Sequence, residues 1–191
     1  MNLPNKLTVL RCAMTFVFLV VLLLNFPFHY GVALLIFIAA SLTDYFDGKI
    51  ARRDGLITNL GKFLDPLADK MLTTAAFLGI MCELGNTDIL CWALMLILAR
   101  EFMVTSVRLL AAKDGVVVAA SFAGKLKTVM QMVSIIYMLT AMQLASFDFL
   151  PSGLRLVLLI VGIVLIWVSV VATVVSGIQY VWALRHYFKE S

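Results

Sequence analysis

Residues 44–70 read DYFDGKIARRDGLITNLGKFLDPLADK, a charged stretch that joins two apolar runs. The runs on either side, residues 31–43 and 71–82, contain no charged residue. Charged groups beside a lipid bilayer are costly, and proteins keep them there mainly where they bind ions, form pairs or do chemistry. Function is therefore expected at four aspartates of this stretch, which are Asp44, Asp47, Asp65 and Asp69.

The composition is that of a membrane protein. Apolar residues make up 63% of the 191-residue chain, well above the roughly half that is usual in soluble domains. Because a spanning helix needs about 20 residues, six helices with short links account for this length. The sequence predicts an all-α, polytopic membrane protein with six transmembrane helices in a single domain, residues 1–191. The expected spans are 8–26, 31–53, 66–84, 89–110, 125–146 and 154–185.

Several other classes of site are not indicated by the sequence. The three cysteines lie in or beside apolar runs without metal-ligand spacing, so we expect buried thiols rather than disulfides. No glycine-rich phosphate loop is present, and no basic stretch is typical of a nucleic-acid-binding surface. We therefore expect no nucleic-acid partner.

Positive charge gathers at one set of alternate helix ends. Of the 15 lysines and arginines, only Arg155 is expected at the opposite ends. Because cytoplasmic loops carry an excess of these residues, both termini are predicted to be cytoplasmic. The uncharged parts of spans two, three and four are too short to cross a core of about 30 Å, so their charged cytoplasmic ends must complete the crossing. This pattern predicts a polar cavity that opens to the cytoplasm at the depth of the inner leaflet. The four aspartates would make it a polar metal site that faces the cytoplasm.

A first pair of carboxylates is expected on the second span. If this span stays helical to its end, Asp44 and Asp47 share a face with Gly48 and Ala51. The two small residues leave the helix backbone open to a bulky ligand, while the carboxylates hold charge. This face is a candidate site for a charged ligand.

A second pair is expected at the start of the third span. Asp65 is predicted at the N-cap with Pro66 at the first helical position, and Asp69 lies one turn further on the same face. Four carboxylates brought together would repel one another unless cations were present. All-oxygen ligation suits Mg²⁺ or Mn²⁺, and two such ions can stabilise the charge of a phosphoryl displacement. The alternative is that acids of this stretch only pair with neighbouring lysines and arginines, which is the expected role of Asp54.

The same residues resemble the signature of the CDP-alcohol phosphatidyltransferase family. The signature reads DxxDGxxAR, eight residues, then GxxxDxxxD, and the chain matches it at every fixed position. The matching residues are Asp44, Asp47, Gly48, Ala51, Arg52, Gly61, Asp65 and Asp69. The resemblance implies a six-helix membrane enzyme, usually a homodimer, that displaces CMP from a CDP-linked lipid with an alcohol.

The resemblance also implies a role for each aspartate. Asp44, Asp47 and Asp65 would chiefly ligate two divalent cations, either Mg²⁺ or Mn²⁺. Asp69 would ligate metal too and would act as the catalytic base toward the acceptor hydroxyl. A free alcohol is a weak nucleophile, so a carboxylate that takes its proton is chemically reasonable.

Nucleotide binding is expected next to this metal site. By the same resemblance, Gly48, Ala51 and Arg52 would face the cytidine diphosphate. Asn5 and Thr8, at the start of the first span, would reach the nucleotide as well, although helix capping is an equally good explanation for both.

The acceptor is indicated outside the signature. The chain resembles the bacterial members that use glycerol 3-phosphate, through NKLTVLR at 5–11, AREF at 99–102 and GKLKT at 124–128. A phosphorylated acceptor needs its own cationic pocket. The candidates for this pocket are Arg100, Arg108, Lys125 and Lys127. Alternatively, these cations only follow the cytoplasmic excess of positive charge and reach toward lipid headgroups. Glu101 would either orient one arginine or only offset its charge.

Together these features predict transfer of the phosphatidyl group of CDP-diacylglycerol to sn-glycerol 3-phosphate, among the membrane lipids of a bacterial cytoplasmic (inner) membrane. Serine, an inositol phosphate or phosphatidylglycerol stays open as an alternative acceptor, and serine would not need the second basic pocket. A cation or proton transporter is the alternative from another class, with acids near mid-bilayer and a path to both faces. The acids here lie toward one face, which favours the enzyme.

Overall fold

Six α-helices make up the described part of the chain, which has no β-strand. The computed structural model describes residues 3–53, 59–85, 87–113 and 122–183. The side chains of some residues in these helices lie outside the description: 3–5, 44–53, 59–66, 69, 87, 109–113 and 183. The helices are α1 (Leu3–Leu23), α2 (His29–Arg53), α3 (Asn59–Leu84), α4 (Thr87–Lys113), α5 (Phe122–Ala145) and α6 (Ser152–Ala183). The all-α prediction is confirmed for these residues.

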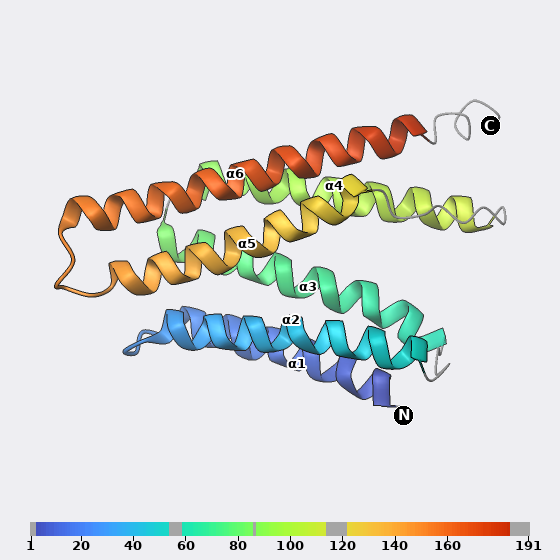
Figure 1. Cartoon of the computed structure of the whole chain (residues 1–191), viewed down its shortest axis with the longest axis horizontal. Coiled ribbons are helices and arrows are strands. Elements are labelled where there is room, and N and C mark those ends of the chain that lie inside the picture. The colour runs from blue at the N-terminus through green and yellow to red at the C-terminus, as the bar shows by residue number, and fades with distance from the viewer. Residues whose placement is uncertain (1–2, 54–58, 86, 114–121, 184–191) are drawn as a thin grey trace.

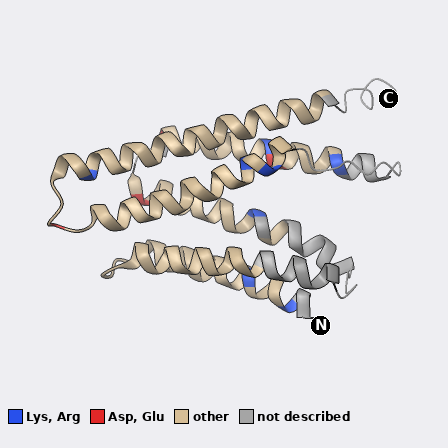
Figure 2. Ribbon diagram, viewed as in Figure 1, with Lys and Arg blue, Asp and Glu red and all other residues tan. Residues whose placement is uncertain are grey.

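The helices run back and forth along the long axis of the molecule (Figure 1). The starts of α1, α3 and α5 and the ends of α2, α4 and α6 lie toward the same end. We call the half of the molecule with these helix ends the basic half, because most described lysines and arginines lie in it (Figure 2). The helix order and this distribution of charge agree with the sequence prediction.

The start of α3 differs from the prediction. α3 begins at Asn59, so Asp65 and Pro66 lie inside the helix rather than at its N-terminus. The predicted N-cap role of Asp65 is therefore wrong. A proline inside a helix removes one backbone hydrogen bond and tends to kink the helix, but the preceding residues can remain helical. Asp65 and Asp69 are still one turn apart on α3, so the expected shared face is retained.

The core of the bundle is apolar and closely packed. Phe18 of α1 and Phe37 of α2 are fully buried, with their ring centroids 5.8 Å apart. At Gly79, α3 approaches α1 so closely that a Cβ atom would lie 2.4 Å from Leu22 Cδ2. A side chain at this position would therefore force the Leu22 side chain to shift. α3 ends where Gly85 adopts a left-handed φ of 63°, which glycine tolerates without strain.

The surface is as apolar as a lipid-facing surface should be. Large apolar side chains such as Phe16, Trp92 and Trp182 are exposed. Among the described residues, four helices have segments long and apolar enough to cross a membrane, and α2 contributes the shorter apolar segment His29–Thr43. The four segments are Lys6–Leu23, Asp88–Arg108, Phe122–Ala145 and Ser152–Trp182. The chain is an integral membrane protein.

The cysteines correct one expectation. All three are free thiols, as predicted, but Cys82 and Cys91 are exposed and Cys12 is half-buried. A lipid-facing surface is itself apolar, so a thiol can lie there at little cost. The prediction that all three are buried is wrong.

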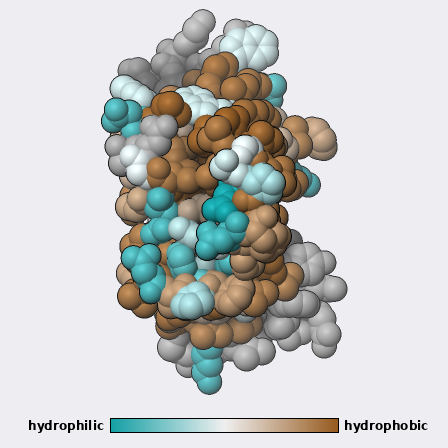
Figure 3. Space-filling model, turned by 90° about the vertical axis from the view of Figure 1, so that its left-hand side faces the viewer, coloured by the Kyte–Doolittle hydropathy of each residue, from teal (hydrophilic) through white to brown (hydrophobic). Residues whose placement is uncertain are grey.

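The half of the molecule opposite the basic half is held together by polar contacts between helices. Tyr30 of α2 donates a hydrogen bond of 2.7 Å to Glu83 Oε2 of α3. The Gly31 backbone N–H donates to Gln143 Oε1 of α5, also at 2.7 Å. Figure 3 views this end of the bundle and shows hydrophilic residues gathered among hydrophobic ones. These contacts fix α2 against α3 and α5.

Candidate active site

The four aspartates lie on the two helices joined by the signature stretch. Asp44 and Asp47 belong to the last part of α2, which is helical to its end as predicted. Asp65 and Asp69 belong to the first half of α3. The side chains of all four lie outside the described part of the structure. Among the described side chains, no group of three or more His, Cys, Asp or Glu could hold a metal ion.

The predicted nucleotide-binding residues lie on α2 and α1. Gly48, Ala51 and Arg52 are on the last turns of α2, and Asn5 is on α1, with side chains outside the described part. Thr8 is buried, with 1% of its surface exposed. Because α1 begins well before Thr8, capping no longer explains this residue.

Arg100 is buried between α4 and α6. Only 8% of its surface is exposed, and its Nη2 donates a hydrogen bond of 2.6 Å to Ser176 Oγ. Gly177 makes room for the stem of the arginine, because a Cβ atom there would lie 2.8 Å from Arg100 Cγ. A buried charge is costly unless it is paired and hydrogen-bonded. α6 therefore supplies both a hydroxyl partner and a slot for this side chain.

Glu101 connects Arg100 to the neighbouring helix. Its Oε1 accepts a hydrogen bond of 3.2 Å from Arg100 Nη1 and another from Lys127 Nζ of α5. Lys70 of α3 donates to Thr105 Oγ1 and, at 3.4 Å, to the backbone carbonyl of Glu101. We call Lys70, Arg100, Glu101 and Lys127 the cationic cluster. It joins α3, α4 and α5, and Arg100 extends it to α6.

The other two predicted cations lie outside this cluster. Arg108 is exposed, and its guanidinium carbon lies 5.8 Å from the centre of the Tyr180 ring on α6. Lys125 is exposed, and no described contact joins it to the cluster. α5 begins at Phe122 rather than at Lys125. Only the first turn of a helix has free backbone N–H groups, and Lys127 lies past that turn. The structure thus brings together Arg100 and Lys127 of the four predicted cations.

Comparison with known proteins identifies the family. The model of the family described as CDP-alcohol phosphatidyltransferase matches residues 1–175. The chain belongs to the CDP-alcohol phosphatidyltransferase family. A Bacillus subtilis (strain 168) protein named CDP-diacylglycerol–glycerol-3-phosphate 3-phosphatidyltransferase is 38% identical over 94% of this chain and 93% of its own length. A Rickettsia bellii (strain RML369-C) protein of the same name is 36% identical over 98% of this chain and 97% of its own.

Membership of the CDP-alcohol phosphatidyltransferase family confirms the resemblance seen in the signature stretch. The matched region includes the four aspartates and the whole cationic cluster. The chain is therefore a transferase, and the alternative of a cation or proton transporter is not supported.

One groove leads from the cationic cluster to the lipid-facing surface. It has a volume of about 400 Å³ and lies between α1, α3 and α4. Lys70 and Glu101 line it together with apolar side chains such as Phe16, Leu67 and Phe102. The accessible surface of this groove is almost entirely apolar, so the groove suits the apolar tails of a lipid rather than its charged head.

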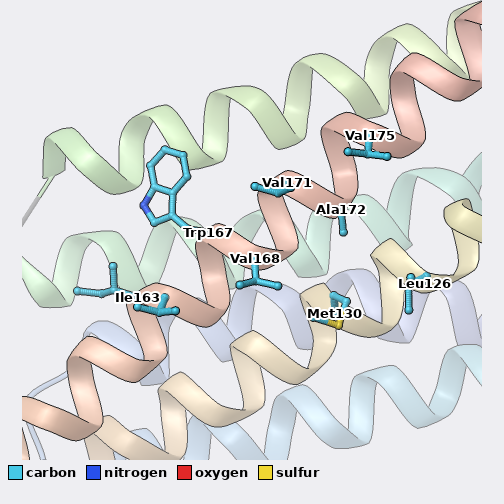
Figure 4. A pocket seen from close by; sticks show the side chains of 9 residues that line it. Leu126, Met130, Ile163, Trp167, Val168, Val171, Ala172 and Val175 are labelled. Carbon is cyan, nitrogen blue, oxygen red and sulfur yellow. The ribbon is translucent and has the colours of Figure 1, made fainter.

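A second groove lies between α5 and α6 and is apolar throughout. It has a volume of about 690 Å³, and Met130, Trp167 and Val171 are among its lining residues (Figure 4). No group in its lining could transfer a proton or hold a metal ion. The lining of this groove therefore offers no candidate for the chemistry.

Sequence reasoning missed Lys70 and Ser176. Lys70 directly follows Asp69, and in the sequence it is one of many cytoplasmic cations. Ser176 carries a signal that could have been read: Ser169, Thr173, Ser176 and Tyr180 recur at helical spacing along an otherwise apolar span. All four are buried in the structure. A polar stripe on an apolar helix predicts a polar partner on the facing helix.

Proposed function

We propose that this protein transfers the phosphatidyl group of CDP-diacylglycerol to sn-glycerol 3-phosphate, forming phosphatidylglycerophosphate and CMP. The observation that carries the choice of acceptor is the buried pair of cations, Arg100 and Lys127, linked to the helix that bears Asp69. A phosphorylated acceptor needs such cations, whereas serine does not. The names of the two relatives support the same reaction.

The aspartates fit a site for two divalent cations. Asp44, Asp47, Asp65 and Asp69 form an all-oxygen donor set on two consecutive helices, as Mg²⁺ and Mn²⁺ prefer. When bound, these ions would stabilise the negative charge of the pyrophosphate during displacement. Asp69 would in addition accept the proton of the acceptor hydroxyl as its oxygen bonds to phosphorus and CMP leaves.

The nucleotide would bind beside these aspartates. Gly48 and Ala51, which have small side chains, would leave the backbone of α2 accessible to the nucleotide, and Arg52 would pair with a phosphate oxygen. Asn5 and Thr8 would approach from α1, which packs against α2. Cytidine and pyrophosphate contacts of this kind would place phosphorus for attack.

The protein would act from the inner leaflet of a bacterial cytoplasmic membrane. All six helices would cross the bilayer as a single domain over residues 1–191, with α2 and α3 completing the crossing through charged cytoplasmic ends. Both termini would be cytoplasmic, which the concentration of cations in the basic half supports. Lipid would enter sideways from the bilayer and glycerol 3-phosphate from the cytoplasm. We expect a homodimer.

The function is tested by measuring CMP release from CDP-diacylglycerol by the purified protein with Mg²⁺ or Mn²⁺. Glycerol 3-phosphate, serine, an inositol phosphate and phosphatidylglycerol are compared as acceptors, and the lipid product is identified by its mass. Release of CMP with glycerol 3-phosphate and formation of phosphatidylglycerophosphate are expected, and removal of the divalent cation should abolish both. Turnover with another acceptor but not with glycerol 3-phosphate would overturn the proposal.

A further inference from the structure

Glu101 holds two cations with a single oxygen atom. Its Oε1 accepts hydrogen bonds from both Arg100 Nη1 and Lys127 Nζ, which come from different helices. We propose that Glu101 is a positioning residue of the acceptor site, which holds these two cations together as a socket for the phosphate of glycerol 3-phosphate. This inference rests on the proposed function and names a residue for the acceptor subsite of that reaction.

The cationic cluster carries more positive than negative charge. Of its four members, Lys70, Arg100 and Lys127 are cations and Glu101 is an anion. Arg100 and Lys127 contact the carboxylate of Glu101, and Lys70 contacts its backbone carbonyl. Excess charge in a poorly solvated place is unfavourable until an ion of opposite sign arrives. A phosphate monoester carries about −1.5 to −2 charges near pH 7. A dianionic phosphate therefore suits the excess of this cluster better than a neutral alcohol does.

Arg100 also has a donor to offer. Its Nε is buried and has no hydrogen-bond partner among the described residues, while its Nη1 and Nη2 are held by Glu101 and Ser176. A buried N–H group without a partner is costly, and such groups are usually satisfied by water or a ligand. Guanidinium groups bind phosphate oxygens strongly because their donors lie in one plane. The pairs with Glu101 and Ser176 fix that plane before the phosphate binds.

Without the carboxylate, the two cations would repel each other. Arg100 and Lys127 have long, flexible side chains that lose conformational freedom when they bind a phosphate. A shared carboxylate restricts both side chains beforehand, so less freedom is lost on binding. Glu101 would thus lower the cost of binding the acceptor without touching it. Because Lys70 contacts the same turn of α4 and directly follows Asp69, the socket is tied to the helix of the proposed base.

A purely structural role for Glu101 makes a different prediction. In that case the carboxylate only neutralises the buried cations, and its loss would lower stability and affect both substrates alike. A positioning role affects the acceptor selectively. The two roles are separated by comparing the KM values for glycerol 3-phosphate and CDP-diacylglycerol in the same variant.

The test uses the purified full-length protein with the substitution Glu101→Gln. We expect the KM for glycerol 3-phosphate to rise about tenfold, the loss expected for a hydrogen bond to a charged group. The KM for CDP-diacylglycerol should stay at the wild-type value. Asp88→Asn is the matched control, because Asp88 lies exposed in the first turn of the same helix, and it should leave both KM values unchanged.

The conservative variant Glu101→Asp keeps the carboxylate charge on a shorter side chain. We expect it to raise the KM for glycerol 3-phosphate less than Glu101→Gln does. If Glu101→Gln does not fold, Glu101→Asp carries the test, since an arm too short to hold both cations should still raise this KM selectively. Equal rises for both substrates, or an unchanged KM for glycerol 3-phosphate, would overturn the positioning role. An inactive wild-type protein would instead overturn the proposed function.

Discussion

The two halves of the molecule use polar residues differently. In the half opposite the basic half, Tyr30 donates a hydrogen bond to Glu83 and the Gly31 N–H donates one to Gln143. These donors and acceptors therefore satisfy one another between helices. In the basic half, Arg100 and Lys127 share the carboxylate of Glu101, and Lys70 contacts the backbone carbonyl of the same residue. The four aspartates lie on α2 and α3. Hydrogen bonds between neutral and polar groups hold a structure together, whereas costly clusters of charged groups are kept where something binds.

The largest effect is expected at the aspartates of the basic half. Asp69→Asn should lower kcat by about 10²- to 10⁴-fold, the usual contribution of a general base. CMP binding, measured by calorimetry, should persist, because the amide keeps the shape of the side chain. Asp88→Asn serves as the control outside the basic half. Near wild-type turnover of Asp69→Asn would show that another group takes the proton.

A smaller effect is expected from the cations. Arg100→Gln should raise the KM for glycerol 3-phosphate by about 10- to 100-fold, since it removes a buried charged donor. Arg108→Gln should raise it less, because Arg108 is exposed and its charge is screened by solvent. Steady-state kinetics with each substrate varied in turn measure both. Equal rises for glycerol 3-phosphate and CDP-diacylglycerol would count against a separate acceptor pocket.

A substitution at Gly177, which makes room for Arg100, should have a smaller effect than the loss of a charge. In Gly177→Ala the new Cβ would lie 2.8 Å from Arg100 Cγ, so the arginine stem must shift without any change of charge. We expect a stability loss of about 1–3 kcal/mol, typical of overpacking, together with a raised KM for glycerol 3-phosphate. Gly153→Ala is the control on the same helix, where no atom lies within 4 Å of the added Cβ. If the two alanine variants bind the acceptor equally well, the position of Arg100 does not matter for binding.

The smallest kinetic effect is expected in the opposite half. Tyr30→Phe removes the hydroxyl that donates to Glu83 and should lower the free energy of unfolding by about 1.5–3 kcal/mol, the contribution of a hydrogen bond to a charged group. Both KM values and kcat should stay unchanged. Tyr137→Phe is the control, since its hydroxyl has no hydrogen bond among the described residues. A selective loss of acceptor binding in Tyr30→Phe would contradict the proposed difference, in which polar residues of this half stabilise the fold and those of the basic half bind the acceptor.

Local patterns in the sequence predicted much of this arrangement. Apolar runs and their charged ends predicted the helices and their order, and the spacing of the aspartates predicted pairs on α2 and α3. The start of α3 was mispredicted because Pro66 is favoured at a helix start but can also lie inside a helix, and spacing alone does not separate the two.

Contacts between distant segments were beyond the reach of the sequence. Glu101 could have paired with either arginine. Only the tertiary structure, in which α4 packs against α6 and Lys127 of α5 reaches α4, shows that Glu101 pairs with Arg100 and Lys127. The slot at Gly177 likewise depends on how closely α6 approaches α4. Such contacts are set by the interhelical distance, which no local pattern encodes.

The central claim, that the cationic cluster of the basic half binds the acceptor's phosphate, is tested most directly by comparing glycerol 3-phosphate with glycerol. The two acceptors share the attacking hydroxyl and differ in the phosphate. With CDP-diacylglycerol and Mg²⁺ or Mn²⁺, kcat/KM from CMP release should favour glycerol 3-phosphate by about 10⁴-fold, as in sites built around a polar group of the substrate. Comparable values for the two acceptors would contradict the account.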